Sequence, residues 1–164
     1  GNGTSQHLSA EFFKKLAGVY ILHIPYRGGA PAVFDIVGGR TDMMFGNMPE
    51  FLGQIRGNGL KPIAFGAPKA SPLYPDLPLI SATLPEFKIT NWFGVVGPGG
   101  LSAEWVRYWN QAIATVAKQP AFIQRMTDNG MDILVGPPDE FRATIAADRK
   151  RWGEVIKGAG IRAD

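Results

Sequence analysis

The stretch VYILHIPYRGGAPAVFDIVGG, residues 19–39, contains a complete strand, turn and helix. Its first part, residues 19–26, is rich in β-branched and aromatic side chains and carries Pro25 near its end, which is typical of a buried strand. A glycine turn follows, and Pro31 marks the expected first position of a short apolar helix that ends at a Gly-Gly pair. The stretch therefore predicts a β-strand followed by a helix, which is the repeating unit of an α/β fold.

The same pattern recurs on both sides of this stretch. Upstream, the chain opens on a glycine-broken turn that enters a helix directly, with no strand before it. Downstream, strands alternate with helices of roughly ten residues, which predicts a parallel sheet built from βαβ units. The other expected elements of this half are a helix over 6–17 that ends at Gly18, a strand over 40–47, a helix over 49–59 and a strand over 60–67.

The chain changes character over residues 68–88. This segment holds five prolines and no sustained hydrophobic period, so we expect an extended crossing rather than a helix or strand. The crossing divides the chain into two α/β parts, residues 1–87 and 88–164. The expected elements of the second part are a strand over 90–100, a helix capped by Ser102, a helix from Pro120 to Asn129, a strand over 131–135 and a long last helix from Pro137.

Charge and composition exclude several kinds of site. The net charge is +3 and the basic residues are scattered, whereas a nucleic-acid-binding surface gathers them on one face. No run of about eighteen apolar residues and no basic start before an apolar run are present, so we expect neither a membrane span nor a signal peptide within these residues. The absence of cysteine excludes disulfides and thiolate metal sites. Since no metal-ligand spacing occurs either, we expect no metal and no cofactor.

The opening turn is the first candidate binding site. At the start of a helix about four backbone N–H groups have no partner within the helix, and the peptide dipoles favour an anion there. Thr4 and Ser5 add hydroxyl groups, and Gln6 and His7 add side-chain donors in the first turn. The simpler alternative is that Thr4 or Ser5 only caps the helix.

The turn YRGGAPA, residues 26–32, is the second candidate, and it enters the helix of the next unit. In open α/β sheets the loops after the carboxyl ends of the strands lie at the same edge, where ligands bind. Two helix starts suited to an anion, at residues 4–8 and 28–32, are therefore expected to face one cleft. Tyr26 would either wall this cleft or lie in the core with its hydroxyl bonded outward, and Arg27 would either supply a charge or be solvated.

Residues suited to catalysis are sparse. The histidines are His7 and His23, and His23 lies inside an expected strand, where a structural role is the simpler interpretation. Ser5 and His7 are too close in sequence to act as nucleophile and base without special geometry, and no G-x-S-x-G motif is present. Asp42 has no acidic partner nearby for acid–base catalysis. We therefore expect a binding protein rather than an enzyme, with a small hydrolase using Ser5 and His7 as the weaker alternative.

Six motifs, taken in order along the chain, resemble one family: GNGTSQHL, HIPYRGGAPA, GGRTDMMFGN, LKPIAFGAPKASPLYPDLP, WFGVVGPGGLS and EFRATIAADRKRWGEVIKGAGI. The chain resembles the tripartite tricarboxylate transporter substrate-binding receptors, also called Bug receptors. The resemblance implies an α/β fold of the two-lobe, type II periplasmic-binding-protein kind that clamps a small carboxylate between its lobes. It also implies a periplasmic location and delivery of the carboxylate to the subunits of a membrane transporter.

Full-length members of this family are longer than this chain, which resembles their C-terminal half or slightly more. The resemblance therefore implies that the N-terminal part of the first lobe is lacking, including the strand that should precede Gly1. Residues 1–87 are then expected to form the second, ligand-binding lobe, and residues 88–164 the C-terminal part of the first lobe. We expect the chain by itself to bind its ligand weakly or not at all, and the face left open to support a homodimer.

Carried over motif by motif, the resemblance places the ligand at the two glycine turns and at the end of the expected strand over 40–47. The expected ligand-binding residues are Thr4, Ser5, Gln6, His7, Tyr26, Gly28, Gly29, Ala30, Pro31, Ala32 and Asn47. The family's strand motif usually ends in MFDN, whereas here it ends in MFGN, so Gly46 removes a carboxylate that could bind an amine or hydroxyl of the ligand. An acid without an amine would suit this loss. The alternative from a different class is the ligand-sensing domain of a regulator built on a similar two-lobe plan.

Overall fold

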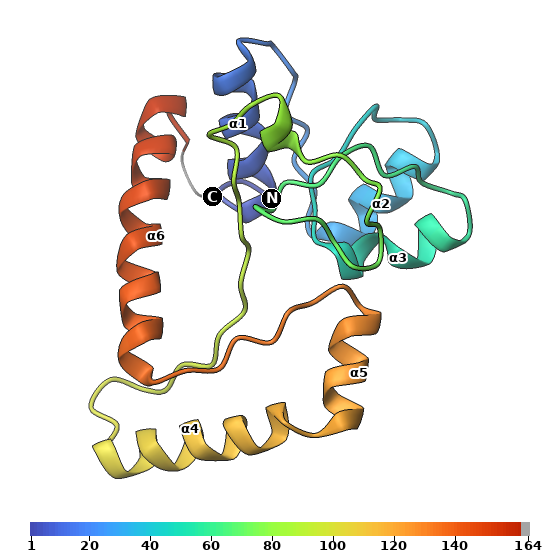
Figure 1. Ribbon diagram of the computed structural model, residues 1–164. Coiled ribbons are helices and arrows are strands. Elements are labelled where there is room, and N and C mark those ends of the chain that lie inside the picture. Colours follow the sequence, from blue (N-terminus) through green and yellow to red (C-terminus); the bar gives the residue numbers. More distant parts are fainter. Residues whose placement is uncertain (162–164) are drawn as a thin grey trace. The chain divides into compact units, whose positions relative to one another are not determined.

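The computed structural model describes residues 1–161, and the chain forms two compact units (Figure 1). The first unit comprises Gly1–Asn91 together with the described residues 152–161, and the second comprises Trp92–Arg151. The long helix α6 (Pro138–Ala159) begins in the second unit and ends in the first. The chain thus passes between the units twice, once after Asn91 and once within α6.

The first unit contains three α-helices where the sequence predicts them, and these predictions are confirmed. They are α1 (Ser5–Ala17), α2 (Gly29–Val37) and α3 (Met48–Arg56). Gly18 ends α1 in the left-handed conformation with φ of 66°, as expected for its role as helix stop. Pro31 is the third residue of α2 rather than the first, which the helix tolerates because N–H groups of the first turn have no partner within it. The crossing segment holds one short 3₁₀ helix, η1 (Ile80–Ala82), which the sequence did not predict.

The segments predicted as β-strands form no ladder of backbone hydrogen bonds within residues 1–161. The pairings found there are two isolated bridges, one of them parallel, between Phe65 and Leu79. The predicted strands over 19–26, 40–47, 60–67, 90–100 and 131–135 are therefore wrong for residues 1–161. Hydrophobic alternation marks segments that favour a sheet, but a strand forms only where a neighbour accepts its backbone hydrogen bonds. The side chains of such segments stay exposed, as at Tyr20 (84%) and Leu22 (67%).

The core of the first unit is built around Phe87, whose side chain is fully buried. The rings of Phe12 and Phe13 from α1, and of Phe45 from the segment before α3, lie with centroids 5.7–6.0 Å from that of Phe87. Gly66 leaves room for this ring, because a Cβ at Gly66 would lie 3.1 Å from Phe87 Cε1. The cluster holds α1 against the segment that leads into α3, so the starts of these two helices are fixed relative to each other.

The second unit contains the other predicted helices, which are also confirmed: α4 (Ala103–Ala117), α5 (Pro120–Asp128) and the first part of α6. Ser102 caps α4 as predicted, since its Oγ accepts from the Trp105 N–H at 3.4 Å. Trp92 packs edge-on against Phe141 at 5.0 Å and donates from Nε1 to Asp148 Oδ2 at 2.7 Å. Among the helices of residues 1–161, none combines the length and apolar character that crossing a membrane requires.

Candidate functional site

The turn before α1 folds back onto the first turn of the helix. Gly3 has φ of 73°, and its N–H donates to His7 Nδ1 at 3.1 Å. Thr4 Oγ1 accepts from the His7 N–H at 3.5 Å and donates to the Gly1 carbonyl at 2.8 Å. Thr4 therefore caps the helix, which is the simpler of its two predicted roles, and the hydrogen bonds among residues 1–161 leave the Ser5 N–H free.

The start of α2 has no side-chain cap. Gly28 precedes the helix with φ of 113°, a conformation that favours glycine, and no side chain accepts from the first-turn N–H groups. A Cβ at Gly29 would lie 3.3 Å from the Glu50 carboxyl carbon, so a side chain at this position would press against the Glu50 carboxylate. An uncapped helix start offers N–H donors and a positive dipole to an external anion.

Glu50, in the first turn of α3, joins the starts of α1 and α3 next to Gly29. Its Oε1 accepts from Gln6 Nε2 at 3.1 Å and from Asn47 Nδ2 at 3.2 Å, and its Oε2 accepts from the Asn47 backbone N–H at 3.3 Å. Gln6 Oε1 in turn accepts from Ser5 Oγ at 3.2 Å, and Asn47 Oδ1 accepts from Asn91 Nδ2 at 2.7 Å. The predicted residues Ser5, Gln6 and Asn47 thus lie in one hydrogen-bonded group with the Glu50 carboxylate. We call the five residues of this group the Glu50 network: Ser5, Gln6, Asn47, Glu50 and Asn91. The sequence analysis missed Glu50, although Asn-x-x-Glu before an apolar residue is a helix-start pattern that could have drawn attention to it.

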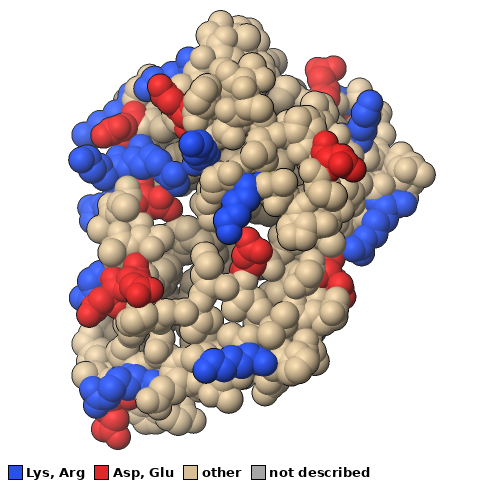
Figure 2. All heavy atoms as spheres, viewed as in Figure 1, with Lys and Arg blue, Asp and Glu red and all other residues tan. Residues whose placement is uncertain are grey.

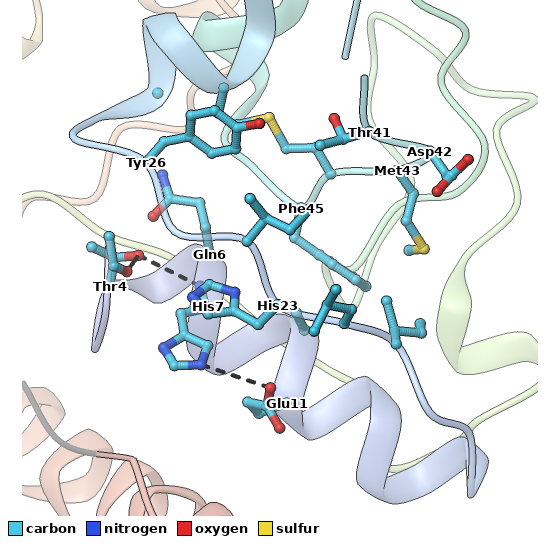
Figure 3. A pocket seen from close by; sticks show the side chains of 18 of the residues that line it. Thr4, Gln6, His7, Glu11, His23, Tyr26, Thr41, Asp42, Met43 and Phe45 are labelled. Carbon is cyan, nitrogen blue, oxygen red and sulfur yellow. Dashed lines mark hydrogen bonds and ion pairs between the residues drawn. The ribbon is translucent and has the colours of Figure 1, made fainter. Parts of the chain in front are cut away.

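A cavity of about 720 Å³ lies beside the two turns, within the first unit (Figure 3). Seven of the eleven ligand-binding residues predicted from the sequence line this cavity: Thr4, Gln6, His7, Tyr26, Gly28, Gly29 and Ala32. The other four predicted residues, Ser5, Ala30, Pro31 and Asn47, are not part of the lining. Apolar side chains of the segments over 20–24 and 41–45 complete the wall. The cavity thus places polar groups from two helix starts against a largely apolar surface, the usual composition of a small-molecule site.

Two histidines lie parallel in this cavity (Figure 3). The rings of His7 and His23 stack with centroids 3.8 Å apart and an interplanar angle of 6°. His7 Nδ1 accepts from Gly3, so the proton of the neutral ring is on Nε2, which faces Glu11 Oε1 at 3.7 Å. His23 Nε2 is buried and has no hydrogen-bond partner among the described residues. The sequence favoured a structural role for His23 and did not predict that this side chain lies in the cavity wall.

Burial keeps both rings uncharged at neutral pH. Desolvation lowers the pKa of His7 below the ordinary value of 6.5, with the Glu11 carboxylate opposing this shift. Desolvation, and then the neighbouring His7, lower the pKa of His23. The stacked pair therefore presents neutral donors and acceptors, not a fixed positive charge.

Tyr26 lies in the cavity wall and is half-buried, not part of the core. Its ring lines the cavity, and its hydroxyl donates to Asp35 Oδ2 at 3.0 Å. Burial, and then the bond to Asp35, raise the pKa of Tyr26, so the phenol stays protonated. Asp35 Oδ1 also accepts from Arg40 at 2.9 Å, which fixes this side of the cavity.

The cavity has no excess of unpaired positive charge from Lys14 and Arg40. Lys14 and Arg40 line the cavity, but their side chains pair with Glu11 at 2.6 Å and Asp35 at 2.9 Å. On the face seen in Figure 2, Lys and Arg side chains lie among Asp and Glu side chains, with no continuous basic stripe. Attraction for an anion would therefore come from local N–H donors and from Arg27, which is exposed and borders the cavity.

Ser5 and His7 are not paired as the predicted hydrolase alternative would require. Ser5 Oγ donates to Gln6 Oε1, and His7 Nδ1 accepts from Gly3, so the Ser5 hydroxyl is not bonded to the His7 ring. A nucleophile and its base need that bond. Within residues 1–161, no group of three or more His, Cys, Asp or Glu residues has the arrangement of a metal site.

Comparison with known proteins gives the family. Residues 1–161 match the tripartite tricarboxylate transporter family receptor. BugT of Bordetella pertussis is 30% identical over 161 residues, which are 98% of this chain and 49% of BugT. The chain therefore spans about half the length of this relative.

Solved structures of similar proteins cover nearly all of the chain. Rpa4515 of R. palustris, solved with adipate, is 31% identical with a TM-score of 0.90, covering 97% of this chain and 54% of that one. The periplasmic binding protein BugD is 28% identical with a TM-score of 0.87, covering 99% and 55%. MatC (Rpa3494) of Rhodopseudomonas palustris, solved with bound malate, is 26% identical with a TM-score of 0.81, covering 94% and 54%. These scores confirm the predicted fold class, which is that of the two-lobe α/β solute-binding proteins. The chain belongs to the tripartite tricarboxylate transporter receptor family.

Proposed function

We propose that this chain is the carboxylate-binding portion of a periplasmic receptor that captures a di- or tricarboxylate, or a related organic acid, and delivers it to a tripartite tricarboxylate-type membrane transporter. The family supports this, as do the adipate and malate held by Rpa4515 and MatC and the periplasmic nature of BugD. In this proposal residues 1–87 form the ligand-binding lobe. Residues 88–164 belong to the other lobe.

The observation that carries the proposal is that the starts of α1 and α2 border one cavity. One carboxylate of the ligand accepts hydrogen bonds from N–H groups in the first turns of α1 and α2. The donors are those of Ser5 and Gln6 in α1 and of Gly29 and Ala30 in α2, which has no cap of its own. The proposed contacts are those that the sequence predicts: Thr4, Ser5, Gln6, His7, Tyr26, Gly28, Gly29, Ala30, Pro31, Ala32 and Asn47. The apolar wall holds the carbon chain of the acid.

Magnitudes favour weak binding by the 164-residue chain. Three or four charge-assisted hydrogen bonds contribute about 1.5–3 kcal/mol each. Association costs about 4–15 kcal/mol in lost freedom, and an open cavity keeps the donors partly solvated. A millimolar dissociation constant, which corresponds to about −4 kcal/mol, is the expected scale.

The test is a titration of the ¹⁵N-labelled chain with malate and with adipate, followed by amide chemical shifts. We expect the amide shifts to concentrate at residues 4–7, 28–30 and 32 and to saturate in the millimolar range. Saturable shifts confined to the second unit, or none with either acid, would refute the proposal. The amides of α5 (Pro120–Asp128), which has no part in the site, provide the internal control.

We also propose that two copies associate through α4. Trp105, Tyr108 and Trp109 are 53%, 56% and 54% exposed, and their rings pack edge-to-face with neighbouring centroids 5.5 Å apart. Each such side chain can bury about 150–250 Å², so a symmetric pair of these surfaces gains substantially on association. Light scattering after gel filtration should give twice the chain mass for the wild type. The double variant Trp105→Ser/Trp109→Ser should have the mass of one chain. A wild-type monomer at all concentrations would exclude this dimer.

A further inference from the structure

We infer that the Glu50 carboxylate selects among ligands: it accepts a hydrogen bond from a hydroxyl or amine of the bound acid and disfavours an acid that lacks such a donor. This inference rests on the proposed function, because it names the ligand chemistry of the same site. Glu50 is exposed, and its carboxylate lies beside Gly29 at the uncapped start of α2.

The first step is the position of the carboxylate. Its carbon is 3.3 Å from the point that a Cβ on Gly29 would occupy, and its Oε1 is 3.1 Å from Gln6 Nε2. Gln6 and Gly29 both line the cavity, whereas Glu50 is not part of the lining and contacts it through these two residues (Figure 3 shows Gln6 and Tyr26 in the wall). A carboxylate ligand held by the N–H groups of α1 and α2 would therefore lie next to a second, fixed negative charge.

The second step is that the hydrogen bonds to the Glu50 carboxylate are long and can be exchanged for a shorter one. Gln6 Nε2, which reaches both oxygens, and Asn47 Nδ2 and the Asn47 backbone N–H make four hydrogen bonds to it at 3.1–3.4 Å, two on each oxygen. A carboxylate offers about four acceptor positions, and charge-assisted hydrogen bonds are typically about 2.7–2.9 Å long. A ligand hydroxyl or ammonium can therefore replace one or both hydrogen bonds from the Gln6 amide with a shorter bond.

The third step is the space that Gly46 provides. A Cβ on Gly46 would lie 2.9 Å from Glu50 Oε2 and would collide with the ring of Phe51. The Glu50 carboxylate thus occupies space that a side chain at residue 46 would contest. The sequence alone suggested that Gly46 leaves the site without a carboxylate and favours an acid without an amine. The structure places the Glu50 carboxylate in that space, so we expect the opposite preference.

A purely structural role for Glu50 makes a different prediction. Its bond to the Asn47 N–H caps α3, and loss of a cap lowers stability without changing the relative affinities of ligands. Glu50→Gln separates the two roles, since glutamine also serves at this position of a capping box and carries no charge. Glu86→Gln is the matched control, because Glu86 is exposed in the same unit and its carboxylate makes no hydrogen bond or ion pair with residues 1–161.

The experiment titrates the ¹⁵N-labelled wild type, Glu50→Gln and Glu86→Gln with succinate, malate and aspartate. These acids share a four-carbon chain and differ at one carbon, which bears hydrogen, hydroxyl or ammonium. We expect the wild type and Glu86→Gln to bind malate and aspartate about tenfold more tightly than succinate, the scale of one hydrogen bond to a charged group. In Glu50→Gln this ratio should fall to near one.

The outcomes separate the inference from the function on which it rests. Saturable binding by all three proteins, with the same succinate-to-malate ratio in Glu50→Gln as in the wild type, overturns the inference and leaves the proposed function in place. A wild type that binds succinate more tightly than malate and aspartate likewise overturns the inference and leaves the proposed function in place. If none of the acids shifts the amides of residues 4–7, 28–30 and 32 in any protein, the proposed function is overturned and the inference with it.

Discussion

Replacing Phe87 by alanine should cost about 4 kcal/mol of the free energy of unfolding. The side chain is fully buried, and three aromatic rings lie 5.7–6.0 Å from it. At about 25 cal/mol per Å², a ring that buries about 150 Å² contributes about 4 kcal/mol, and Phe-to-Ala changes in cores cost about 3–5 kcal/mol. The loss also frees α1 from the segment that leads into α3, so the Glu50 network should loosen as well.

Urea denaturation followed by far-UV circular dichroism measures the effect. Phe34→Ala is the matched control in the same unit, because Phe34 is 71% exposed and contacts Arg40 only through a cation–π pair at 5.8 Å. That change should cost less than about 1 kcal/mol. Should Phe87→Ala fail to fold, Phe87→Leu should lower the midpoint by an intermediate amount, at a cost of about 1.5 kcal/mol. Equal effects of the Phe87 and Phe34 substitutions would refute the assignment of Phe87 as the centre of the core.

Three further predictions concern pH, a turn and a helix cap. The free energy of unfolding should fall as the pH drops from 7 through 6.5, because burial lowers the folded-state pKa of His7 and His23 and the unfolded chain, with a pKa near 6.5, binds more protons. The fall should stop below the folded-state values, and a flat profile in urea titrations would contradict it. Gly28→Ala should destabilise by about 1–2 kcal/mol because φ is 113°, whereas Gly53→Ala, in open space on α3, should stabilise by about 0.5–1 kcal/mol. Thermal melts that rank these two variants in the other order would disprove the turn geometry. Ser102→Ala should cost about 1 kcal/mol and Ser102→Asp close to none, as measured by urea denaturation; an equal loss in both would show that the cap contributes nothing.

The helices could be predicted because their determinants are local. Thr4 and Ser102 cap α1 and α4, Gly18 ends α1, and the apolar period over each helix is visible in a single stretch of chain. The strands could not be predicted in this way. Alternation over residues 19–26 shows which side chains favour burial, but the hydrogen bonds of a strand depend on a second segment that the pattern does not specify.

The helix starts beside the cavity were predictable for the same reason, because glycine turns before helices identified the starts of α1 and α2. The rule for sheet edges led us to expect them at one cleft. The rule does not explain why both border one cavity, because residues 1–161 form no strand ladder. Glu50 and the His7–His23 stack were not accessible, because each depends on side-chain contacts between residues far apart in sequence: Gln6 with Glu50, and one ring with another. Such contacts follow from packing around Phe87, not from spacing along the chain.

The exposed segment over 19–24 has a consequence for handling the protein. Its six residues, VYILHI, have high β-propensity and no acidic or basic side chain apart from one histidine, and Tyr20 and Leu22 project into solvent at 84% and 67% exposure. Hexapeptides of this composition stack readily into cross-β fibrils when their backbone edges are open. Concentrated solutions should therefore develop thioflavin-T fluorescence over time. Leu22→Lys, which introduces a gatekeeper charge, should delay its onset.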